Sequence, residues 1–160
     1  MKIMYCHHGN RKVNGKPTQD DELTDIGIND CENVSQLLEI VKHKENIKCI
    51  YTSQFFRCKK TAQLINSKIN VPIKEDKRLD EFKSVKNETW EDCQNRVTDL
   101  LKEIIKTYNE DDFVICVTSG VNIAGFLNLA YNIKADTQNP FLLVPSCSPI
   151  IFNFDKSKID

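Results

Sequence analysis

Long hydrophobic runs, linker-type segments and closely paired cysteines are all missing from this sequence. No apolar stretch among its 160 residues approaches the roughly 18–20 residues that cross a bilayer, so no membrane partner is expected. Only five Gly and five Pro occur, which leaves little room for linkers and favours a single domain over residues 1–160. The seven cysteines are odd in number, scattered and without a Cys-x-x-Cys motif, which favours free thiols and a cytoplasmic location.

An excess of one charge is missing too. The 22 Lys and Arg residues balance 23 Asp and Glu residues, for a formal net charge of −1. Proteins that bind nucleic acid carry a basic surface, so a near-neutral chain predicts no nucleic-acid partner. The remaining composition, 40% hydrophobic and 28% charged, is ordinary for a globular protein and leaves the oligomeric state open.

Short apolar runs alternate with segments of helical apolar spacing. The runs predict strands at 3–6, 47–52, 113–117, 142–144 and 150–154, with a short extended piece at 71–73. The helical spacing predicts helices at about 24–42, 53–69, 89–108 and 119–130. This alternation predicts an α/β fold, a three-layer α/β/α sandwich with a mostly parallel central sheet.

Local signals refine these elements. Thr24 and Ser53 are residue types that cap helix N-termini, so each is expected to start a helix. Ile26 and Leu37 recur at helical spacing with other apolar residues as far as Val41, which predicts that the first helix runs to about Lys42. The run at 113–117 is apolar throughout and is therefore typical of a central strand covered on both faces.

Polar and charged side chains follow three of the predicted strands. Ligands of such sheets bind at the carboxyl ends of the strands, and loops leave those ends after Cys6, Thr52 and Val117. The loops carry His7-His8-Gly9-Asn10, Ser53-Gln54-Phe55-Phe56-Arg57 and Thr118-Ser119-Gly120. We expect the chemistry of the protein where these loops meet.

These segments, in this order, resemble the motifs of the histidine phosphatase superfamily, also called the phosphoglycerate mutase-like family. His7-His8-Gly9-Asn10 is similar to its Arg-His-Gly-Glu motif, and residues 53–62 to its Ser-Pro-x-x-Arg-x-x-x-Thr-Ala motif. Further similar segments are Asn14, Asp20 and Leu23-Thr24-Asp25-Ile26-Gly27, then Leu79-Asp80-Glu81, Glu88-Thr89-Trp90 with Arg96, and Val117-Thr118-Ser119-Gly120. The resemblance covers most of the chain, and the ordered set is more specific than any one motif.

The resemblance implies a phosphoglycerate mutase-like fold and a phosphohistidine reaction. His8 would be the nucleophile, Arg57 would bind the phosphoryl oxygens, and Glu81 would donate a proton to the leaving group. His7, Asn14 and Ser119 would complete the phosphate site. The expected partner is a small phosphorylated substrate or a phosphate-like anion, with no cofactor and no metal.

Two positions depart from the family pattern and keep two functions open. His7 stands where the family has Arg, and Ser119 where it has a second His. An arginine offers a permanent forked charge that a histidine supplies only in part and only when protonated. The loss of one preorganised donor typically lowers a rate by ~10²–10³. The protein is therefore expected to be either a weakened histidine phosphatase or an inactive relative that binds a phosphorylated ligand or protein partner. A phosphoglycerate mutase is less favoured, because the chain is short and its first motif is changed.

Other readings of the same residues have less support. Arg11, Lys12 and Lys16 lie in the first loop, and one of them could compensate for the missing charge. A metal site at Cys6-His7-His8 is disfavoured because neighbours on a strand point to opposite faces. A cysteine phosphatase is disfavoured because Lys12, and not an arginine, stands at the Cys-x₅-Arg spacing from Cys6. Glu81 lies in a charge-rich segment and is equally compatible with a surface position.

Overall fold

The structure, a computed structural model, describes residues 1–13, 18–83, 86–131 and 144–155. Its elements follow in the order β1 (Lys2–His7), α1 (Asp25–Val41), β2 (Asn46–Thr52), α2 (Phe56–Asn66), β3 (Ile73–Glu75), the 3₁₀ helix η1 (Lys77–Leu79), α3 (Trp90–Thr107), β4 (Asp112–Thr118), α4 (Gly120–Ala130) and β5 (Pro149–Asn153). Residues 142–143 of the predicted strand at 142–144 lie outside the described residues, and Val144 belongs to no strand. In this part of the chain no helix has the length and apolar character of a membrane span.

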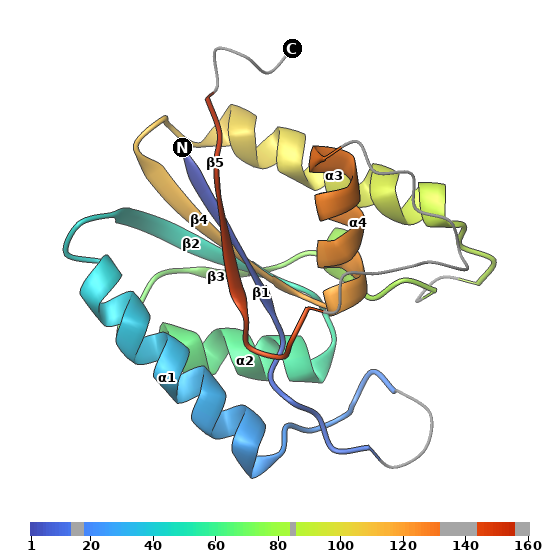
Figure 1. Cartoon of the computed structure of the whole chain (residues 1–160), viewed down its shortest axis with the longest axis horizontal. Coiled ribbons are helices and arrows are strands. Elements are labelled where there is room, and N and C mark those ends of the chain that lie inside the picture. Colours follow the sequence, from blue (N-terminus) through green and yellow to red (C-terminus); the bar gives the residue numbers. More distant parts are fainter. Residues whose placement is uncertain (14–17, 84–85, 132–143, 156–160) are drawn as a thin grey trace.

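One five-stranded sheet runs through the molecule in the order β3-β2-β4-β1-β5 (Figure 1). Its first four strands are parallel, and β5 pairs antiparallel with β1 at one edge. All seven residues of the central strand β4 are buried, as its apolar sequence predicted. β3 begins two residues later than the predicted piece at 71–73, because Pro72 has no N–H for the ladder and offers only its carbonyl, to Ile50 N (2.9 Å).

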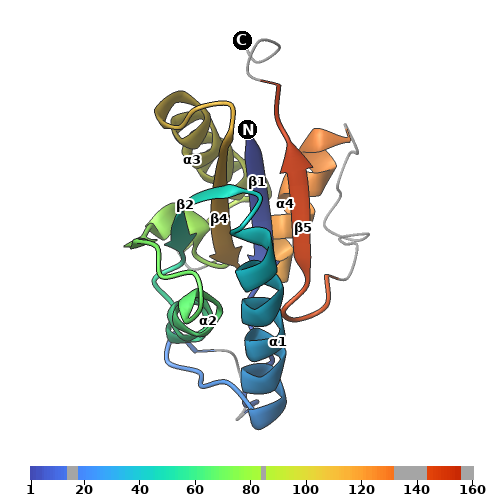
Figure 2. The same ribbon diagram turned by 90° about the vertical axis from the view of Figure 1, so that its left-hand side faces the viewer.

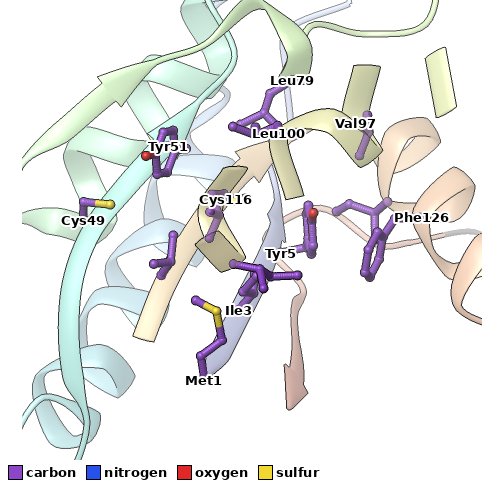
Figure 3. Packing of buried hydrophobic residues seen from close by; sticks show 14 of the residues in the cluster. Met1, Ile3, Tyr5, Cys49, Tyr51, Leu79, Val97, Leu100, Cys116 and Phe126 are labelled. Carbon is purple, nitrogen blue, oxygen red and sulfur yellow. The ribbon is translucent and has the colours of Figure 1, made fainter. Parts of the chain in front are cut away.

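Helices cover both faces of the sheet and divide the core in two (Figure 1 and Figure 2). Side chains alternate along β1, so that Ile3 and Tyr5 join the cluster under α3 and α4, which Figure 3 shows from close by. Met4 and Cys6 point the other way, into the cluster under α1 and α2. The three-layer α/β/α sandwich predicted from the sequence is therefore confirmed.

Two details of the helices depend on tertiary contacts. α2 begins at Phe56, not at Ser53, because the Ser53 hydroxyl donates to Asp80 Oδ1 (2.7 Å) and leaves the cap position to Phe55. In α1, Ile26 and Leu37 recur at helical spacing with buried residues, yet they are 69% and 48% exposed. Helical spacing marks a wide apolar face, and only the packing of neighbouring elements decides which residues at its margins are covered.

The start of α1 is fitted closely against the loop that follows β1. Thr24 caps the helix by accepting a hydrogen bond from Gly27 N (3.0 Å), and its own N–H donates to Asn10 O (2.9 Å). A Cβ at Gly27 would lie 2.4 Å from that same carbonyl oxygen. Glycine is therefore required here for the close approach of two backbones, one of which carries the histidine pair of the first loop.

Gly27→Ala tests this close approach, because the fit predicts that the exchange lowers the free energy of unfolding where it would normally raise it. Glycine inside a helix normally costs about 1 kcal/mol relative to alanine, so the exchange would usually stabilise the protein. Here we expect a loss of about 1–3 kcal/mol in the free energy of unfolding, because the new methyl group overlaps a backbone oxygen. Urea denaturation measures it, with Asn33→Ala on the exposed face of α1 as the control that should cause no loss. Equal or higher stability of Gly27→Ala would contradict the fit.

Candidate active site

The three loops singled out in the sequence meet at the carboxyl edge of the sheet. The His8 N–H donates to Thr118 O (3.0 Å), and the Ser53 N–H donates to Val117 O (3.1 Å). Beside these contacts lies a pocket of about 330 Å³. It is lined by His7, His8, Asn10, Arg11, Val13, Glu81, Gly120, Val121, Val144 and Ser146.

His8 and Arg57 are in direct contact beside this pocket. Arg57 Nε donates to His8 Nε2 (3.0 Å), while His8 Nδ1 lies 2.9 Å from Gly9 O. A carbonyl can only accept, so the proton of the neutral ring sits on Nδ1 and the lone pair sits on Nε2. The nitrogen that a histidine nucleophile needs is thus the one that faces the guanidinium.

Burial keeps the His8 ring neutral. The side chain is 6% exposed, and burial lowers the pKa of His8 to about 3; the neighbouring His7, Arg57 and Arg11 act in the same direction, while the Gly9 carbonyl opposes them. At neutral pH the ring is uncharged and its lone pair is available. A neutral imidazole with a fixed tautomer is the form that can attack phosphorus.

Arg57 is the most deeply embedded charged group of the site. It is 1% exposed, although it stands in the first turn of α2. Its Nη1 donates to Thr18 O (2.7 Å), its Nη2 forms an ion pair with Glu81, and its guanidinium lies 4.8 Å from the centre of the Phe55 ring. A buried guanidinium is tolerated only when its N–H groups have such partners.

One hydroxyl joins the loop of His8 to the helix of Arg57. Thr61 Oγ1 accepts from Gly9 N (2.9 Å) and donates to Arg57 O (2.7 Å). Thr61 matches the family motif in the sequence, but no role is predicted for it there. The side chains at positions 57 and 61 lie one helical turn apart, which is the spacing that allows one threonine to serve both partners.

Glu81 reaches the site from a segment that the sequence suggested only weakly. The preceding Asp80 accepts from Ser53 Oγ (2.7 Å) and Gln54 N (2.8 Å), and Asn122 Nδ2 donates to Asp80 O (2.8 Å). These contacts tie the segment to the loop after β2 and to the first turn of α4, and the Glu81 carboxylate forms an ion pair with Arg57. The sequence did not indicate that Asp80 and Asn122 position this segment. Their only signal is a polar residue among buried ones, and that pattern is not specific for such a role.

His7 lies against α4 and faces His8. Its Nδ1 is 2.7 Å from Val144 O, and the two imidazole rings meet edge to face with centroids 4.4 Å apart. A Cβ at Gly120 would lie 3.0 Å from His7 Cε1, so the ring occupies space that is open because position 120 is a glycine. Burial lowers the pKa of His7, and Arg57 adds to this, while the carbonyls of Val144 and Pro145 and the Glu81 carboxylate oppose it.

The other predicted site residues are placed differently. Ser119 is 2% exposed, its Oγ lies 3.4 Å from Asn122 N at the start of α4, and it is not part of the pocket wall. Asn14 and Lys16 lie outside the described residues. Lys12 pairs with Glu22 on the surface (2.7 Å). Arg11 lines the pocket and pairs with Asp21 (2.8 Å).

Thiols and metal ligands add nothing further to this centre. All seven cysteines are buried and free. Among the described residues, no three His, Cys, Asp or Glu side chains are grouped so that they could hold a metal ion. The reactive groups that line the pocket are the imidazoles of His7 and His8, the Arg11 guanidinium and the Glu81 carboxylate.

The fold and the pocket together define an α/β protein with a buried imidazole–guanidinium pair at the carboxyl edge of its sheet. The model of the histidine phosphatase superfamily (branch 1) matches residues 4–85 and 82–160, so the chain belongs to this superfamily. No curated protein matches the chain.

Solved structures share the fold at low sequence identity. Bacillus stearothermophilus YhfR has a TM-score of 0.83 and 22% identity, with 96% of this chain and 91% of that one covered. The protein histidine phosphatase SixA, complexed with tungstate, has 0.73 and 14%, with 98% and 90% covered. A mycobacterial glucosyl-3-phosphoglycerate phosphatase in complex with VO₃ has 0.76 and 16%, with 94% and 90% covered. The phosphoglycerate mutase-like fold expected from the motifs is thereby confirmed.

The lowered pKa of His8 predicts how stability depends on pH. The unfolded chain binds a proton near pH 6.5, whereas the folded protein does not until about pH 3, so stability is lost as the pH falls below 6.5. The loss from His8 approaches about 1.4 kcal/mol per pH unit. His8→Asn should therefore lose less free energy of unfolding than the parent between pH 7 and pH 5, as measured by urea denaturation. The exposed His43→Ala should keep the parent's dependence; identical curves for His8→Asn would contradict the buried neutral ring.

Proposed function

We propose that the protein is a histidine-type phosphatase that hydrolyses a small phosphomonoester through a phosphohistidine on His8. The contact between His8 Nε2 and Arg57 Nε, 3.0 Å long and beside an open pocket, is the observation that carries the proposal. It pairs a neutral nucleophile with a permanent cation that binds phosphoryl oxygens in a forked geometry. Two solved relatives of the same fold bind the oxyanions tungstate and VO₃, which supports an anion site.

A phosphoryl group reaches this centre by replacing contacts within the protein. Glu81 occupies Arg57 Nη2 and the His8 lone pair occupies Arg57 Nε. An arriving phosphate offers oxygens to the same N–H groups, so that the carboxylate is displaced and the lone pair is released towards phosphorus. Phosphoryl transfer depends mainly on positioning and on neutralising charge at the equatorial oxygens, and Arg57 at the start of α2 supplies both.

The two departures from the family pattern lower the expected rate without removing the nucleophile. Position 7 offers an imidazole in place of a forked cation, and the Ser119 side chain lies at the start of α4 outside the pocket wall. Fewer charged donors then surround the phosphoryl group, so we expect turnover below that of a site with the full set. Among the described residues that line the pocket, Arg11 carries a permanent positive charge.

His8→Ala should abolish hydrolysis of p-nitrophenyl phosphate and the acid-labile phosphate that the parent takes up from it. The expected loss of kcat is at least ~10³-fold, because the substitution removes the imidazole that would attack phosphorus. Rapid quenching under conditions that preserve the acid-labile phosphate, followed by mass spectrometry, locates the modified residue. His43→Ala is the matched control and keeps full activity. If the parent binds vanadate but forms no phosphohistidine, the protein is a phosphate-binding relative without catalysis.

Arg11→Ala should weaken vanadate binding by about tenfold, the effect of one lost cation in the pocket wall, at roughly 1.4 kcal/mol. The neighbouring Lys12→Ala removes an equal charge that is paired with Glu22 on the exposed surface, and it should leave the affinity unchanged. Calorimetric titration with vanadate measures both variants. Equal affinity of the parent and Arg11→Ala would remove Arg11 from the anion site.

A further inference from the structure

We infer that His7 is a catalytic residue that carries the proton of the reaction, giving it to the leaving-group oxygen and taking it back from the attacking water. This inference rests on the proposed function, because it assigns a role within that same site. It moves the proton-donor role, which the sequence resemblance gives to Glu81, to the second imidazole of the pocket.

The position of His7 suits this role. It lines the pocket next to the nucleophile, with the two ring centroids 4.4 Å apart. Its Nδ1 lies 2.7 Å from Val144 O and so keeps its proton, which leaves Nε2 as the nitrogen that gains and loses one. Gly120 provides the space for the ring, since a Cβ there would lie 3.0 Å from His7 Cε1 and the ring would have to shift. The orientation of His7 is therefore held from two sides, by a carbonyl and by the start of α4.

Glu81 is engaged with another group of the site in the free protein. Its carboxylate forms an ion pair with the Arg57 guanidinium, which the entering phosphate must displace. Glu81 then remains in the pocket wall together with His7. A negative charge in that place stabilises a protonated imidazole.

The charges that face His7 set the pH range in which it can act. Burial and Arg57 favour the neutral ring, and Arg11 lines the same pocket. Glu81 and the carbonyls of Val144 and Pro145 favour the protonated ring, and a bound phosphate dianion adds two further negative charges on that side. In the free protein, burial is the largest of these effects and the pKa of His7 is lowered.

The reaction balances with this single proton carrier. In the first step the His8 Nε2 lone pair forms a bond to phosphorus, the bond from phosphorus to the leaving oxygen breaks, and that oxygen takes the proton from His7 Nε2. In the second step a water oxygen attacks phosphorus while His7 Nε2 accepts one of its protons. The bond to His8 breaks and returns the electron pair to Nε2. The products are an alcohol and phosphate, and His7 is again protonated.

Leaving-group dependence distinguishes a proton donor from a residue that only binds phosphate. A p-nitrophenolate ion leaves without a proton, whereas the alkoxide of ethyl phosphate requires one. His7→Asn keeps an amide N–H for Val144 O but cannot exchange a proton. We expect it to lower kcat/KM for ethyl phosphate by ~10²–10⁴-fold and for p-nitrophenyl phosphate by less than ~10-fold. Glu81→Gln should instead affect both substrates to the same extent.

The pH dependence gives a second readout. The ratio of the kcat/KM of the parent to that of His7→Asn for ethyl phosphate cancels the ionisation of the substrate itself. Because the protonated form of His7 is the active one, this ratio should fall as the pH rises through the pKa of His7. His7→Gln, whose amide offers a donor near the place of Nε2 without a transferable proton, should behave as His7→Asn does. Circular dichroism confirms that both variants are folded.

Three outcomes would overturn the assignment. These are an equal loss on both substrates in His7→Asn, a loss confined to ethyl phosphate in Glu81→Gln, or a ratio independent of pH. In each case trapped phosphohistidine on His8 in the parent would leave the proposed function standing. Absence of that phosphohistidine in a parent that still hydrolyses p-nitrophenyl phosphate would remove the proposed function together with the role of His7.

Discussion

The hydrogen bond from Arg57 Nε to His8 Nε2 is the interaction on which the rest of the site depends. A guanidinium that is 1% exposed is stable only with partners for its N–H groups, and these partners come from three separate segments: His8 after β1, the Thr18 carbonyl, and Glu81 after η1. The cation therefore holds together loops that are distant in sequence. It also explains why His8 must be neutral, since a protonated ring could not accept this bond.

Much of the fold could be predicted from the sequence because its signals are local. Thr24 and Thr89 mark helix starts by their own side chains, and the apolar run of β4 marks a strand covered on both faces. The start of α2 could not be predicted, because the partner of Ser53 is Asp80, 27 residues away in the chain. The exposure of Ile26 and Leu37 depends likewise on neighbouring elements and not on spacing.

The sequence predicted which residues belong to the candidate site, but it could not predict how their side chains are arranged. Order along the chain pointed to His8, Arg57 and Glu81, and parallel strands bring their loops to one edge. Two contacts arise only in the tertiary structure and leave no local pattern in the sequence. They are the ion pair between Arg57 and Glu81 and the packing of the His7 ring against Gly120. The two unusual positions, 7 and 119, prove to be neighbours of the same helix start. One fills the space above Gly120, and the other lies buried in the turn before it.

The Thr61 hydroxyl joins the backbones on the two sides of the His8–Arg57 pair. It bonds the Gly9 amide and the Arg57 carbonyl at once, so a displacement of either backbone strains the same hydroxyl. The spacing between the imidazole and the guanidinium is therefore fixed by the fold before any ligand arrives. Under the proposed function, an anion entering the pocket would lose little entropy in aligning the two groups.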